Sequence, residues 1–212
     1  MRHLATTILL FLSLTSKGQT TLGIGLVSIN FNDKTVLHFY NDPTDKEPVK
    51  TIEFFNDSNN WNIRNLNKQI EWLRPEVLWL DYSSFVFRCK SKSENWYQVI
   101  VNNDTGKSLW IKKDSFIVFS GWENFLKGMF GIARLRDTKQ KIRKSPNDTA
   151  QEINYDCKYD CFQVKSMKGD WIEIFSTDDC DDGTDTKCGI IKSGWIRWRK
   201  GNKLLIEYFV TS

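Results

Sequence analysis

Histidine is scarce in this chain of 212 residues, which contains only two, His3 and His38. His3 lies in an N-terminal segment that we expect to be removed, so His38 would remain alone. A single histidine excludes metal sites built from several imidazoles and leaves few ways to pair with a catalytic thiol. His38 has apolar neighbours in the segment TVLHFY, which favours an ordinary strand residue over a general base.

The sequence motifs of common enzyme classes are also missing. The chain has no Gly-x-Ser-x-Gly, no His-Glu-x-x-His and no glycine loop of the kind that cradles phosphate. Pairs of carboxylates for glycoside hydrolysis need only meet in space, and nothing in the sequence singles out such a pair. We therefore expect a protein that is not an enzyme and carries no cofactor.

An apolar run lies at the N-terminus, but it is too short to cross a bilayer. Residues 4–14 are apolar for the most part, follow a basic start at Arg2 and precede a polar segment with small residues up to Gly18. This order predicts a secretory signal, residues 1–18, cleaved after Gly18, and hence a secreted or periplasmic protein. A buried first strand or helix is the alternative. No later segment approaches the ~20 apolar residues of a membrane helix, so no integral membrane segment is expected.

Positive and negative charges are nearly balanced. The 30 basic and 26 acidic side chains give a formal net charge of +4, and loss of Arg2 and Lys17 with the signal would lower it further. This balance lacks the clustered basic surface that nucleic acids require, so no nucleic-acid partner is expected. A basic run over 134–144 and an acidic run over 178–185 are typical of a solvated linker and a solvated loop.

The number of cysteines, five, is odd. Cys180 and Cys188 flank the acidic loop, and a disulfide between them would close a ring of about nine residues and stabilise the fold by about 2.5 kcal/mol. Cys157 and Cys161 could pair with each other or with those two, which leaves Cys89 as a buried thiol. A four-cysteine zinc site is the alternative, but the second pair is spaced too widely and export favours disulfides. We therefore expect no metal.

Aromatic side chains are abundant, with nine tryptophans and fourteen phenylalanines. They help to define a pattern that occurs twice. A tryptophan-initiated strand at Trp96 is followed by a second strand around Trp110, and a similar strand at Trp171 is followed by one that contains Trp195. Each pair comes after a segment that reads as two strands about a proline turn. Alternating apolar and polar residues indicate antiparallel strands, and the shared order indicates a duplicated unit.

The two units are joined by residues 120–137. The apolar side chains at Trp122, Phe125 and Leu126 have helical spacing, and Ser120 with Glu123 matches a capping box. The segment predicts a short amphipathic helix, followed by a basic linker, with its apolar face packed on one of the units.

Three short motifs follow one another in the second unit. They are Arg143-x-x-Pro146, the Gly-Asp-Trp-x-x-Ile of residues 169–174, and the Gly-Trp-Ile of residues 194–196. This order resembles the bacterial SH3-like domain. The first unit matches more loosely, because Trp110 does not directly follow a glycine and residues of about 57–80 form an insertion.

The resemblance implies a mostly β protein of two small antiparallel SH3-like barrels. The first would cover residues 19–119 and the second residues 138–212, joined by the helix and linker of residues 120–137. In secreted bacterial proteins such a barrel is an accessory module that binds cell-wall peptides or other peptide-like ligands. A cell-wall peptide or a protein ligand is thus the expected partner, although a fold alone does not settle function.

The alternation of side chains along a strand separates an inner from an outer face. In the second unit, if the aliphatic side lines the barrel, Trp171, Trp195 and Arg197 point outward. In the resembled fold these strands are antiparallel neighbours, which places the two tryptophans side by side and Arg197 close enough to stack. The same alternation gives an outward pair in the first unit, Trp96 and Trp110.

These five side chains are the candidate ligand-binding residues. An exposed aromatic pair leaves apolar surface in water, which soluble proteins seldom tolerate without a reason. The alternative is a structural or inhibitory partner protein, in which the tryptophan faces are domain or subunit interfaces.

Overall fold

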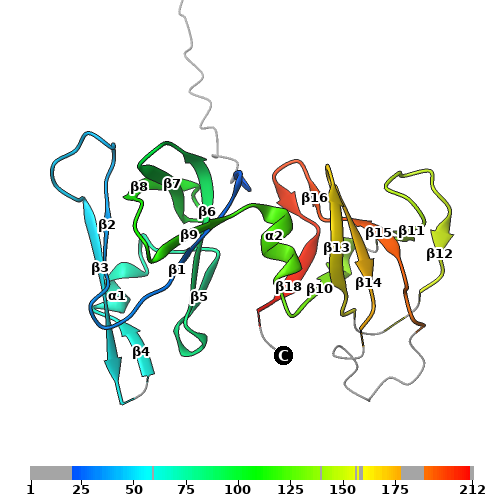
Figure 1. The fold of residues 1–212 in the computed structure, drawn as a ribbon, viewed down its shortest axis with the longest axis horizontal. Coiled ribbons are helices and arrows are strands. Elements are labelled where there is room, and N and C mark those ends of the chain that lie inside the picture. Colours follow the sequence, from blue (N-terminus) through cyan, green and yellow to red (C-terminus); the bar gives the residue numbers. More distant parts are fainter. Residues whose placement is uncertain are drawn as a thin grey trace, which may run out of the picture.

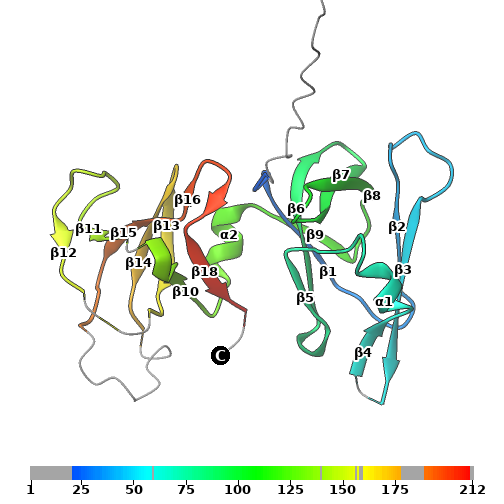
Figure 2. The same ribbon diagram turned by 180° about the vertical axis from the view of Figure 1, so that it is seen from behind.

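A computed structural model of the chain describes residues 21–58, 60–138, 140–155, 157, 160–177 and 189–210. The fold is mostly β and antiparallel, as the sequence predicts, with a few short helices (Figure 1). The expected signal segment, residues 1–18, lies outside the described residues. Figures 1 and 2 show two groups of strands with one helix, α2, between them.

The first half of the chain forms a six-stranded sheet and a three-stranded sheet. Its strands are β1 (Gly25–Ile29), β2 (Val36–Phe39), β3 (Lys50–Asp57), β4 (Asn60–Ile63), β5 (Val77–Trp79), β6 (Ser84–Lys92), β7 (Trp96–Asn102), β8 (Lys107–Lys112) and β9 (Ile117–Ser120). The larger sheet has the order β8-β7-β6-β1-β9, with β5 also paired to β6, and the smaller has the order β2-β3-β4. The predicted insertion contributes β4, the helix α1 (Leu66–Gln69) and β5.

The second half forms a five-stranded sheet and two two-stranded sheets. Its elements are α2 (Trp122–Lys127), β10 (Gly131–Arg134), the 3-10 turn η2 (Arg136–Thr138), β11 (Ile142–Arg143), β12 (Glu152–Ile153), β13 (Gln163–Lys168), β14 (Trp171–Phe175), β15 (Gly194–Arg197), β16 (Arg199–Lys200), β17 (Lys203–Leu204) and β18 (Ile206–Phe209). The sheet has the order β12-β11-β15-β14-β13, while β10 pairs with β18 and β16 with β17.

The expectation of two closed barrels needs correction, because no sheet in the described ranges closes on itself. In the first half, the β2-β3-β4 sheet meets β8 only through an isolated bridge between Tyr40 and Trp110. In the second half, the corresponding link is one bridge between Ile132 and Phe162. A single bridge supplies too few hydrogen bonds to continue a strand ladder, so each half is a set of open sheets packed around a core.

The predicted connecting helix is present but short. It ends at Lys127, where Gly128 follows, and the chain then enters β10. Its N-cap is Gly121 and makes no side-chain cap hydrogen bond, so the expected capping box is wrong. Instead, the Ser120 hydroxyl donates to the carbonyl oxygen of Gly121. Gly128 and Gly131 each disfavour a helix by up to about 1 kcal/mol, which accounts for its early end.

Two hydrophobic cores meet at this helix. The first lies within the first half, and the second gathers the apolar side chains of the second half together with Trp122, Phe125 and Leu126 of α2. The second core also takes in Leu22 and Val86 from the first half. The contact between the halves is therefore an apolar seam, and we use "seam" for it below.

A buried polar cluster crosses the same seam. The Glu76 carboxylate accepts a hydrogen bond from the Tyr208 hydroxyl of β18 at 2.5 Å and from the Asn103 side-chain amide at 2.7 Å. It also forms an ion pair with Arg88 of β6. Burial, reinforced by the neighbouring Glu76 charge, raises the pKa of Tyr208, so its hydroxyl stays protonated and donating. We call these four residues the Glu76 cluster.

Candidate functional site

The outer face of β14 and β15 carries three of the five candidate residues. Antiparallel pairing sets Ile172 opposite Ile196, and both are fully buried. Because side chains alternate along each strand, Trp171, Trp195 and Arg197 lie on the opposite face. Strands β14 and β15 lie inside the sheet, between β11 and β13, so the backbone of each is hydrogen-bonded on both sides.

Arg197 lies over the ring of Trp171. The two residues are paired across the strands, and the guanidinium carbon is 4.5 Å from the ring centroid. A cation over an indole face is favourable, and here the tryptophan keeps only 8% of its surface exposed. The expected stacking of Arg197 is thus present, but Trp171 faces outward beneath a cover instead of standing free.

Trp195 does not lie directly opposite Trp171. Its cross-strand partners are Glu173 in β14 and Arg143 in β11, and its side chain is partly buried. The carboxylate of Glu173 accepts hydrogen bonds from the hydroxyls of Ser166 and Ser193, which fix its position. The register thus displaces Trp195 along the strand from Trp171, and Arg197 occupies the cross-strand position that the sequence analysis gave to Trp195.

Asp148 completes this arrangement from outside the strands. Its two carboxylate oxygens accept hydrogen bonds from the Arg197 guanidinium at 3.1 Å (from Nε) and 2.6 Å (from Nη2). The hydrogen bond from Arg197 and the charges of Arg197, Arg143 and Lys200 lower the pKa of Asp148. Asp170 is a more distant neighbour, 3.8 Å from Nη1 of Arg197. We call Trp171, Arg197 and Asp148 the Trp171 site.

Asp148 belongs to the turn between β11 and β12. Hydrogen bonds within the turn define it: Lys144 N–H donates to the carbonyl of Gln151, and Asn147 accepts from the backbone of Thr149. The Arg143 guanidinium donates to the Ala150 carbonyl at 2.7 Å. These contacts hold the turn in one conformation and present Asp148 near its tip.

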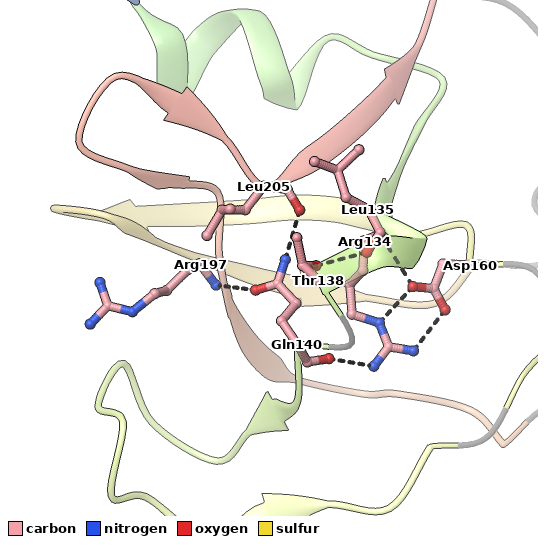
Figure 3. Close-up of polar contacts among 7 residues, drawn as sticks. All are labelled: Arg134, Leu135, Thr138, Gln140, Asp160, Arg197 and Leu205. Carbon is pink, nitrogen blue, oxygen red and sulfur yellow. Dashed lines mark hydrogen bonds and ion pairs between the residues drawn. The ribbon is translucent and has the colours of Figure 1, made fainter.

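Gln140 holds the backbone of Arg197 (Figure 3). Its side-chain oxygen accepts from the N–H of Arg197 at 3.0 Å, and its side-chain nitrogen donates to the carbonyl of Leu205 at 2.9 Å. Its own carbonyl accepts from Arg134, which forms a two-pronged ion pair with Asp160. This amide is a residue that sequence reasoning missed, because nothing in its local pattern distinguishes it from an exposed linker side chain.

The outward pair of the first half has a different environment. Trp96 lies opposite Lys112, and Trp110 lies opposite Gln98, so the two tryptophans are again offset by two residues along the strands. The Tyr40 ring packs edge-on against Trp96 with centroids 5.3 Å apart. Two backbone hydrogen bonds of 2.8 and 2.9 Å join Tyr40 to Trp110. Both tryptophans are partly buried, and Tyr40 forms their cover.

The cysteines divide into described and undescribed residues. Cys89 is a buried free thiol, as predicted, and desolvation raises its pKa to about 12, so it is unreactive at neutral pH. Neither Cys157 nor Cys161 is a free thiol. Cys180 and Cys188 lie outside the described residues, so the pairing of the four stays a prediction. Within the described ranges, no three His, Cys, Asp or Glu side chains gather as a metal site would require.

One exposed aromatic pair was missed by the sequence analysis. Trp79 and Tyr82 contact each other at the end of β5 and in the 3-10 turn η1 (Leu80–Tyr82), and they are 50% and 59% exposed. They lie within or beside the predicted insertion, which matched no repeat. The unusual density of aromatic residues there was the available signal.

Comparison with family models, with curated proteins and with solved structures finds no match to this chain. None of the helices in the described ranges has the length and apolar character needed to span a bilayer. The Trp171 site is therefore interpreted from its own chemistry.

Proposed function

We propose that this chain is a secreted, non-enzymatic binding protein of two SH3-like units, which recognises a cell-wall or protein peptide through the outer face of β14 and β15. The observation that carries the proposal is the Arg197 guanidinium, which lies on the Trp171 ring and forms a two-pronged hydrogen bond with a carboxylate. Tryptophan and arginine are the residue types most enriched at energetically important interface positions.

The local architecture supports a binding role. The outer face of a paired strand offers a rigid platform, and Trp195 adds a partly exposed ring next to Arg197 along β15. Sites on strands hold their geometry better than sites on loops. A peptide that binds across this face would contact both an aromatic surface and the Arg197 guanidinium. Apolar contacts supply affinity in such sites, and a few polar groups fix the orientation of the ligand.

A second candidate is a structural or inhibitory partner protein whose aromatic faces serve as interfaces. The observation in its favour is the exposed Trp79–Tyr82 pair, since exposed aromatic surface marks interaction sites. Light scattering on a size-exclusion column separates the two candidates. A stable oligomer that loses its assembly on Trp79→Ala supports the second, and a monomer supports the first.

The proposed function is tested by pull-down with purified cell wall and, separately, with envelope protein. We expect Trp195→Ala to reduce binding more than tenfold while the far-UV spectrum and melting temperature stay close to those of the wild type. Trp79→Ala is the matched control, because it removes a half-exposed tryptophan from β5 in the other half of the chain and leaves the β14–β15 face intact. If both variants lost the same amount of binding, or if the wild-type chain did not bind, the outer face of β14 and β15 would be excluded as the binding surface.

A further inference from the structure

The Trp171 site already holds a carboxylate, and that carboxylate belongs to the protein itself. We propose that Arg197 binds the free C-terminal carboxylate of a peptide ligand, and that Asp148 occupies this position until the ligand displaces it. This inference rests on the proposed function and specifies the chemistry of the same site. Asp148 is thus an internal competitor.

Arg197 is the fixed member of the pair. Its side chain is 31% exposed, lies on the Trp171 ring, and extends from a strand whose backbone N–H is bound by Gln140. A guanidinium held over an aromatic ring has restricted freedom, and its paired N–H groups match the two oxygens of a carboxylate. The receptor half of the interaction is therefore organised before any ligand arrives.

Asp148 is the replaceable member. Its side chain is 67% exposed and lies in a turn, and no hydrogen bond to its carboxylate within the described residues comes from a group other than Arg197. An ion pair exposed to this degree contributes little to stability, so breaking it costs little. A ligand that brings a carboxylate together with apolar contacts to Trp195 would gain more than the turn loses.

The charges around the position favour an anion. Besides Arg197, the positive charges of Arg143 and Lys200 act on the Asp148 carboxylate. A second acid, Asp170, lies 3.8 Å from Nη1 of Arg197, but its closer partner is Arg199, at 2.7 Å. A cationic ligand that displaced Arg197 from Asp148 would have to move the more buried partner off its ring, so the anionic ligand fits better.

The experiment compares two test ligands, N-acetyl-Ala-Ala-Ala with a free carboxylate and the same peptide with a C-terminal amide. Binding is followed by shifts of the tryptophan and arginine side-chain N–H signals in NMR spectra of the full chain. Asp148→Asn should bind the free acid about tenfold more tightly than the wild type, the gain expected if Asp148 occupies Arg197 nine-tenths of the time. The amide should bind neither form measurably.

Two further variants complete the design. Arg197→Lys keeps the positive charge but loses the planar guanidinium that can donate to both carboxylate oxygens. Combined with Asp148→Asn, it should bind the free acid at least severalfold more weakly than Asp148→Asn alone. Asp104→Asn is the matched control, because Asp104 is 65% exposed and pairs with the exposed Arg74 in the first half. It should leave the affinity unchanged.

Equal affinity of wild type and Asp148→Asn for the free acid would overturn the inference, as would equal binding of acid and amide or no binding of the acid to Asp148→Asn. If Arg197→Gln bound a peptide with a C-terminal lysine more tightly than the wild type does, the site would prefer a cationic ligand to an anionic one. In each of these cases, a Trp195-dependent pull-down would still support the proposed function, so the two failures are distinguishable.

Discussion

The two outward tryptophan pairs arise from the same strand alternation and lie under different covers. In the first half, Tyr40 packs against Trp96 and is joined to Trp110 by two backbone hydrogen bonds. In the second half, the cover of Trp171 is a side chain, Arg197, held in place by another side chain, Asp148.

This difference separates a structural surface from an exchangeable one. Backbone hydrogen bonds that are shielded from water cannot be broken without exposing polar groups, so the Tyr40 cover is part of the fold. An exposed ion pair can exchange one carboxylate for another at little cost. We therefore propose that the second half binds the ligand and that the aromatic pair of the first half serves packing, although the sequence treats the two pairs alike.

The largest expected effect tests how far Trp171 supports the fold. Trp171→Ala should lower the free energy of unfolding by about 3 kcal/mol, because it empties a site that is almost fully covered. Trp195→Ala should cost only about 1 kcal/mol, the usual size for a partly exposed side chain. Urea denaturation measures both. Equal losses would mean that the two rings of the second pair are covered to the same degree in solution.

An intermediate effect tests the cover of the first pair. Tyr40→Ala should lower the free energy of unfolding by about 2 kcal/mol, since it removes an edge-on aromatic contact and its apolar area. Tyr40→Phe keeps the ring and should change stability by less than about 0.5 kcal/mol. Thermal unfolding provides the comparison. If Tyr40→Phe cost as much as Tyr40→Ala, the hydroxyl and not the ring would make the important contact.

The smallest expected effect is the titration of Asp148. Its pKa lies below the ordinary value of 3.8 because Arg197 donates to the charged form, and in Arg197→Gln it should rise toward that value. Since the folded pKa is the lower one, the stabilisation is present above the ordinary pKa and is lost as the pH falls through the lowered value. NMR of the carboxyl carbon measures this shift, and an unchanged pKa in Arg197→Gln would show that the pair does not form in solution.

The faces of the strands were predictable because alternation is a local property. Ile172 and Ile196 could be assigned to the interior from strand period alone. The pairing of β14 with β15 came from the resemblance, which placed Trp195 beside Trp171 with Arg197 within stacking reach, whereas the actual register sets Arg197 opposite Trp171. The covers were not predictable, since Tyr40 and Asp148 come from distant segments whose approach depends on tertiary packing. The open sheets were missed for a related reason, because a resemblance in motifs does not specify how many ladder hydrogen bonds join the last strands.

The Glu76 cluster has a consequence for the order of folding. Tyr208 and Glu76 are 132 positions apart in the chain, whereas Glu76, Arg88 and Asn103 all belong to the first half. Contacts between such distant residues form slowly, because closing a long loop costs conformational entropy before the contact stabilises the chain. We therefore expect the first half to assemble its own part of the cluster before the Tyr208 hydroxyl of the second half docks onto Glu76.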